Sequence, residues 1–189
     1  TTREPIQIGA ELYGHAGLEA DLEVLRLMSR ALSAAGLERL HLDIGHPRIY
    51  RALAEGAALG AEEAESLFHA VQQKDAPAVL AMGAALGEER AEAIARLTRL
   101  NGGAAVLDEA RKALPKNPAI GAALDELARL AREVAAPGLE VSFDLAELGG
   151  QSQVGCSSDI EFALSALDPP CRNFQVGAAQ RVFHILHRQ

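Results

Sequence analysis

Cysteine is scarce in this chain of 189 residues, which has only Cys156 and Cys171. Two cysteines placed this late form neither a disulfide framework nor a Cys-x-x-Cys metal pair. Their scarcity excludes a disulfide-stapled secreted domain and a cysteine zinc site. The compartment that we expect is therefore a reducing cytoplasm.

Positive charge and long apolar runs are also lacking. The chain has 18 Lys and Arg against 26 Asp and Glu, which gives a formal net charge of −8. A nucleic acid interface needs a surplus of Lys and Arg on one face, so the composition argues against a nucleic acid partner. No apolar stretch approaches the roughly 20 residues that cross a bilayer, and the start Thr1–Glu4 does not resemble a signal segment. We expect neither secretion nor a membrane partner.

The most informative stretch that is present is Arg3–Gly14, where apolar and polar residues alternate. Alternation of period two predicts a strand over residues 6–13 with Gln7, Gly9 and Glu11 on one face. An amide and a carboxylate beside a residue without a side chain leave room for a ligand. We interpret this face as the floor of a pocket for something small and cationic, although exposed polar residues at a strand rim have the same pattern.

The next segments alternate between helix and strand. Apolar residues at helical spacing begin at Leu18, and Gly36 ends the helix. Period-two alternation returns at Leu40–Ile44 and at Leu139–Leu145, where Asp144 lies on the polar face. This order predicts an α+β fold in which a helix packs on one face of a sheet.

Between those two strands the pattern is helical and rich in Ala, Leu, Glu and Arg. We expect a helical insertion over residues 47–136 between two parts of a sheet, residues 1–46 and 137–150. Residues 151–189 hold both cysteines and no lysine, and we assign them to a divergent C-terminal tail produced by a reading-frame change or by splicing. The helices expected in the insertion are Arg48–Glu55, Ala61–Gln73, Ala76–Leu86, Glu88–Leu100, Ala104–Leu114 and Ile120–Ala135.

Three motifs resemble a known family. Arg3–Gly14 and the acidic run Leu18–Glu23 resemble the end of the second signature motif of histidyl-tRNA synthetases, and still more the regulatory subunit of ATP phosphoribosyltransferase. Phe143–Leu148, which reads Phe-Asp-Leu-Ala-Glu-Leu, is also similar to that subunit. The resemblance implies a fragment with part of a class II aminoacyl-tRNA synthetase-like antiparallel sheet and a helical insertion. It ends near Gly150, because Gly149–Gly155 stands where the family continues with an Arg-Gly-Tyr loop.

The resemblance also implies a function. Such a subunit is non-catalytic, has no cofactor and forms a hetero-oligomer with the short catalytic subunit, which performs the first step of L-histidine biosynthesis. L-histidine is the implied effector and mediates feedback inhibition. The implied histidine-binding residues are Gln7, Gly9, Glu11 and Asp144. For Asp144, a cap or turn acid at a strand end is an equally good interpretation.

Two alternatives remain open: a fragment of a histidyl-tRNA synthetase, which activates histidine with ATP and charges tRNA, and an inactive truncated helical interaction module. The tail has no counterpart of the arginine with which the third synthetase motif holds ATP, which argues against aminoacylation. The six histidines form no set of metal ligands, so we expect no metal. An amphipathic C-terminal helix is the preferred interpretation of His184 and His187.

Overall fold

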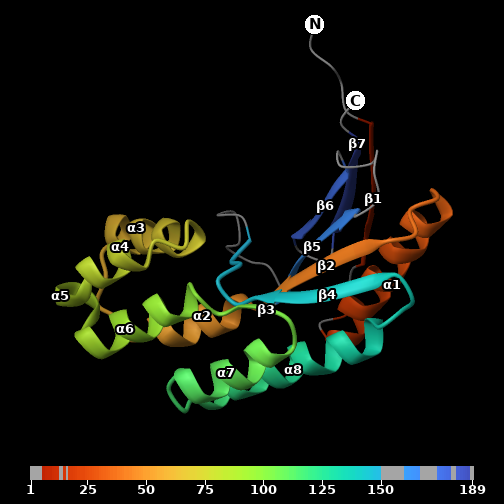
Figure 1. The fold of residues 1–189 in the computed structure, drawn as a ribbon. Coiled ribbons are helices and arrows are strands. Elements are labelled where there is room, and N and C mark those ends of the chain that lie inside the picture. The colour runs from red at the N-terminus through yellow and green to blue at the C-terminus, as the bar shows by residue number, and fades with distance from the viewer. Residues whose placement is uncertain are drawn as a thin grey trace, which may run out of the picture. The chain divides into compact units, whose positions relative to one another are not determined.

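A computed structural model describes most of the chain, and its contacts divide it into two compact units (Figure 1). The first unit comprises residues 1–44, 129–142 and 149–189, and the second comprises residues 45–128 and 143–148. In strands 6–11, 161–166, 174–179 and 182–187 only the backbone is described. The described residues are 6–12, 15, 17–149, 160–166, 174–179 and 182–187.

The first unit is built on an antiparallel sheet. Strand β1 (Ile6–Glu11) pairs with β7 (Val182–His187), β7 with β6 (Phe174–Ala179), and β6 with β5 (Glu161–Ala166). The order continues through β2 (Leu40–Gly45) to β4 (Leu139–Asp144). Strand β1 therefore lies at one edge of the sheet.

Helix α1 (Leu18–Ala34) lies beside this sheet (Figure 1), and its apolar stripe is buried. On β2 the predicted alternation is confirmed, because Leu40, Leu42 and Ile44 are buried whereas the residues between them are half-buried. The helix ends as predicted, since Gly36 takes a φ of 85°, which residues with a Cβ rarely adopt. The buried residues of the α1 stripe include Leu22, Leu25, Met28 and Leu32.

Exposed ion pairs join α1 to the end of α8 (Pro118–Val134). Arg129 contacts Glu19 at 3.0 Å and Glu133 at 2.7 Å. The hydrogen bond to Glu133 is the main cause of the raised pKa of Arg129, whereas a backbone hydrogen bond and then Arg129 lower the pKa of Glu19. Water screens these charges, so the pairs contribute little to stability.

The second unit contains residues 47–128 of the segment predicted as a helical insertion, and the bounds of that insertion stay a prediction. The helices are confirmed to within a few residues at their ends, with one exception: the single helix expected over Ala76–Leu86 is divided at Met82. Asp75 caps the first of the two as predicted, because its Oδ1 accepts a hydrogen bond from Ala78 N at 3.0 Å. The helices are α2 (Pro47–Ala54), α3 (Ala61–Gln72), α4 (Ala76–Ala81), α5 (Gly83–Leu86), α6 (Glu88–Leu97), α7 (Ala105–Ala113) and residues 118–128 of α8.

Two described strands differ from the sequence prediction. Strand β3 (Asn101–Gly102) pairs antiparallel with the end of β4, where we expected only a break between helices. The C-terminal helix proposed for His184 and His187 is wrong, because both residues lie in β7. The spacing of residues within a segment does not show which distant strand it pairs with, and in both segments this pairing determines the strand conformation. The α+β class itself is confirmed.

The described helices include none that is both long enough and apolar enough to cross a membrane.

Gly45 ends β2 at a close approach of two backbone segments. A Cβ on this residue would lie 2.7 Å from Glu147 Cβ, 2.8 Å from Glu147 O and 2.9 Å from Asp144 O. Two of those atoms are backbone oxygens, which cannot rotate away. We therefore expect Gly45→Ala to lower the free energy of unfolding by about 1–3 kcal/mol, the cost of overpacking.

Gly83→Ala is the matched control, because nothing lies within 4 Å of its added Cβ, inside α5. It should raise the free energy of unfolding by up to about 1 kcal/mol, since alanine is the better helix former. Urea unfolding followed by circular dichroism measures both variants. Equal stability of the two would contradict the close approach at Gly45.

Tyr50 of α2 packs edge-on against Phe68 of α3, with ring centroids 6.3 Å apart. Burial raises the pKa of Tyr50 to about 12. The unfolded phenol ionises near pH 10, so the unfolded state loses its proton first. Stability should be unaffected below about pH 10 and should fall as the pH rises towards 12.

Ultraviolet titration of the tyrosines tests this expectation. The late-ionising component should disappear in Tyr50→Phe, which also removes the alkaline loss of stability. A wild-type titration with only normal phenols would show that Tyr50 is not buried as described.

Candidate functional site

Strand β1 carries three of the four residues predicted to bind histidine. In its backbone pairing with β7, Gln7 stands opposite Leu186, Gly9 opposite His184 and Glu11 opposite Val182. The side chains of this strand lie outside the described residues. The pocket floor therefore stays a prediction.

The fourth residue, Asp144, lies in the second unit at the end of β4 and is only 7% exposed. Its Oδ2 forms an ion pair with Lys74 Nζ at 2.7 Å, and its Oδ1 accepts a hydrogen bond from Ala146 N at 3.1 Å. These contacts fit the interpretation of Asp144 as a turn acid at a strand end. Its contact with histidine stays a prediction.

A further polar cluster lies on β2 and β4 of the first unit. Ser142 Oγ donates a hydrogen bond to Asp43 Oδ1 at 2.6 Å and lies 2.9 Å from His41 Nε2. The single hydroxyl proton goes to Asp43, so His41 Nε2 must be the donor to Ser142. An imidazole that donates cannot also remove the serine proton, which distinguishes this cluster from a Ser-His-Asp nucleophile. The cluster can bind a polar ligand but is not built for acyl transfer.

Strands β7, β6 and β5 stand between β1 and β2 in the sheet order. At about 4.8 Å for each of the four strand-to-strand steps, β1 and β2 are roughly 19 Å apart. One free amino acid is too short to contact both strands. The Ser142 cluster is therefore separate from the pocket predicted on β1.

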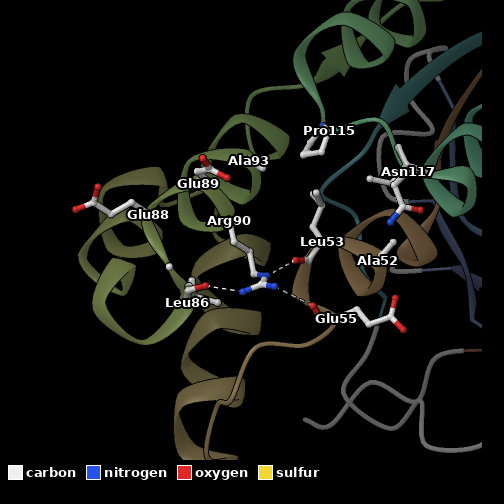
Figure 2. Close-up of a pocket in the computed structure, with 12 residues that line it drawn as sticks. Ala52, Leu53, Glu55, Leu86, Glu88, Glu89, Arg90, Ala93, Pro115 and Asn117 are labelled. Atoms are coloured by element: carbon white, nitrogen blue, oxygen red, sulfur yellow. Dashed lines mark hydrogen bonds between the residues drawn. The ribbon is translucent and has the colours of Figure 1, made fainter.

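A cleft of about 760 Å³ opens within the second unit, between the end of α2, the start of α6 and the connection from α7 to α8 (Figure 2). We call it the acidic cleft. Its apolar lining consists of the buried residues Leu53, Leu86, Ala93 and Ile120. Its exposed acidic residues are Glu55, Glu88 and Glu89.

Arg90 is the basic residue of the acidic cleft, and its guanidinium donates to three backbone carbonyls (Figure 2). Nε donates to Leu53 O at 3.0 Å, Nη1 to Leu86 O at 2.6 Å, and Nη2 to Glu55 O at 3.1 Å. These carbonyls stand at the C-terminal ends of α2 and α5, where a helix leaves its last acceptors unpaired. Arg90 therefore joins two helix ends to α6.

Sequence reasoning missed both the Ser142 cluster and the Arg90 contacts. Alternation placed His41 and Asp43 on one face of their strand, but it did not show that this strand adjoins Ser142. Arg90 looked like an ordinary charge on a solvated helix. Backbone carbonyls are present at every residue, so no residue type in the sequence marks those that Arg90 binds.

Comparison with known families and sequences finds clear relatives. The family model described as histidyl-tRNA synthetase matches residues 1–153. The chain is 49% identical over 162 residues to the ATP phosphoribosyltransferase regulatory subunit of Thiobacillus denitrificans. That match covers 86% of this chain and 49% of the relative, so the chain spans about half the length of this relative.

Solved structures share the fold. A structure described as an ATP phosphoribosyltransferase regulatory subunit/histidyl-tRNA synthetase from Bacillus halodurans superposes with a TM-score of 0.72 at 23% identity, covering 95% of this chain and 51% of that one. The HisG:HisZ complex of ATP phosphoribosyl transferase from Thermotoga maritima gives 0.63 at 14% identity, covering 97% and 66%. The class II synthetase-like fold predicted from the sequence is thereby confirmed.

The Arg90 contacts predict a measurable stability effect. Arg90→Gln should lower the free energy of unfolding by about 2 kcal/mol, because three carbonyls, two of them in part-buried contacts, lose a charged donor. Arg90→Lys should restore only part of this loss, since an ammonium lacks the planar fork of donors.

Arg96→Gln is the control, because exposed Arg96 makes an i,i+4 pair with Glu92 at 2.7 Å and, among the described residues, only one long hydrogen bond to a carbonyl, that of Ala113 at 3.4 Å. Its loss should cost about 0.5 kcal/mol or less. Urea unfolding of the three variants makes the comparison. An Arg90 variant as stable as the Arg96 variant would show that the three carbonyl contacts contribute little.

Proposed function

This chain belongs to the histidyl-tRNA synthetase family, and we propose that within it the chain is part of a regulatory subunit of ATP phosphoribosyltransferase. The observation that carries the proposal is the 49% identity to such a subunit over 86% of this chain. The fold alone would not separate the two roles, because one solved structure of this fold bears both descriptions. The sequence likeness therefore favours regulation over aminoacylation.

The proposed subunit is non-catalytic and acts in a cytoplasmic hetero-oligomer with the short catalytic subunit. That complex joins ATP to phosphoribosyl pyrophosphate in the first step of L-histidine biosynthesis. Support for assembly comes from the similar fold found in the two-component Thermotoga maritima complex. The contribution of this chain would be binding energy and not reacting groups.

L-histidine is the proposed effector, and β1 is its proposed binding strand. The carboxylate of Glu11 is suited to accept hydrogen bonds from an imidazole N–H or an ammonium, and Gln7 supplies an amide beside it. Gly9 between them would leave room for the ligand. Histidine then inhibits only if it binds one assembled state better than the other.

A reconstitution experiment tests the proposal. The chain is mixed with the short catalytic subunit, and association and phosphoribosyl-ATP formation are measured with and without histidine. We expect association and a histidine-inhibited activity that the catalytic subunit alone lacks.

The full-length subunit from Thiobacillus denitrificans is the positive control. If the full-length subunit binds the catalytic subunit and this chain does not, the proposal for this chain is contradicted. Histidyl-tRNA formation by the chain with ATP and tRNA would instead establish the synthetase alternative.

Substitution on β1 tests the effector site. Glu11→Gln should raise the histidine concentration for half-inhibition by about tenfold, the effect of losing one charge-assisted hydrogen bond. Glu23→Gln, which neutralises an exposed acid on α1, is the control and should leave it unchanged. Equal sensitivity of the two variants would remove Glu11 from the site.

Asp144→Asn separates the two interpretations of that residue. If Asp144 is only a turn acid, the substitution should lower the free energy of unfolding, through the contacts with Lys74 and Ala146, and should leave inhibition by histidine unchanged. A ligand contact should also weaken inhibition by histidine.

A further inference from the structure

We infer that the acidic cleft of the second unit receives a cationic segment of the protein partner, in which a Lys or Arg stands beside apolar side chains. The inference rests on the proposed function in one respect, because the partner to which it commits is the short catalytic subunit. The site itself lies entirely within the second unit and uses none of the residues proposed for histidine.

The shape of the cleft suits an anchoring side chain. Its volume of about 760 Å³ has room for several side chains, and its lining includes the apolar side chains of Leu53, Leu86 and Ile120. Apolar pockets bounded by polar rims are where interfaces place the side chains that contribute most to affinity. The cleft therefore has the form of a receptor for a protruding segment.

The charge of the cleft specifies what that segment carries. Glu55, Glu88 and Glu89 are exposed at the rim, and among the described residues none of them has an ion-pair partner. Arg90 adds one positive charge to the cleft, so three carboxylates and one guanidinium leave it acidic by two charges, and the Arg90 donors are directed at three carbonyls (Figure 2). A long cationic side chain can lay its apolar stem on the floor while its charge meets the rim.

A second hollow of about 460 Å³ continues the surface across the connection from α7 to α8. It shares Pro115, Asn117 and Ile120 with the acidic cleft, but its charged residues are Arg111 and Lys116. Arg111 is paired with Asp125 at 2.7 Å, so Lys116 is the cation left to meet a partner. The partner segment therefore carries a basic residue at the acidic cleft and an acidic residue beyond Pro115, which fixes its direction.

Charge reversal at the acidic cleft tests the inference. Glu89→Lys should weaken association of the chain with the short catalytic subunit by about tenfold at low salt, and by less at high salt, because rim charges act through screened attraction. Isothermal titration calorimetry measures both conditions.

Glu62→Lys is the matched control. Glu62 of α3 and Glu89 of α6 are both exposed, and each is the second residue of its helix, near the positive end of the helix dipole. Only Glu89 lines the cleft. Association of this variant should stay within about twofold of wild type, since isolated surface charges contribute little. Thermal melts by circular dichroism show that both variants remain folded.

Reversing the positive charge of the second hollow tests the direction in which the partner segment lies. Lys116→Glu should also weaken association, whereas Lys112→Glu, an exposed cation of α7 outside both hollows, should not. Equal effects of Glu89→Lys and Glu62→Lys, or no effect of either, would overturn the inference while leaving the proposed function intact.

Two further outcomes identify a different failure. A wild-type chain that does not bind the catalytic subunit would overturn the proposed function and this inference together. Self-association of the chain that Glu89→Lys abolishes, with binding to the catalytic subunit unchanged, would overturn the inference and assign the cleft to a second copy.

Discussion

The second unit depends on one close backbone contact, where Gly45 at the end of β2 meets the turn that follows β4. Asp144 and Glu147 approach Gly45 so closely that a Cβ would lie within 2.9 Å of three of their atoms. The same turn is held from two other directions, by the pairing of Asn101 with Asp144 and by the ion pair from Lys74. Segments that are distant in sequence thus all contact the turn that follows β4.

In the second unit, two charged residues hold a turn and the ends of helices. Asp144 accepts from a turn amide while it binds Lys74, and Arg90 satisfies carbonyls at the ends of two helices. These groups already have partners within the protein. The charged groups without such partners are therefore the ones that indicate a ligand. Under the proposed function, the unmatched carboxylates of the acidic cleft are available for a partner.

Local pattern predicted most of the fold. The helices of the insertion follow from apolar residues at helical spacing and from breakers such as Gly60 and Gly87, which act on their immediate neighbours. The break at Met82 was missed, although Gly83 follows it directly and begins α5. Strand β3 was missed and β7 was taken for a helix, since both are stabilised by strands far away in the sequence.

The sequence by itself determined the α+β class, the approximate ends of the helices, the family resemblance and the polar residues of β1. Only the tertiary structure decided which polar and charged groups contact one another. Ser142 and His41 are 101 positions apart, and Arg90 binds a carbonyl 37 positions away. Periodicity and capping act between residues within a few positions of one another, so they can be read from order alone. A contact across such separations exists only after the strands have paired and the helices have packed.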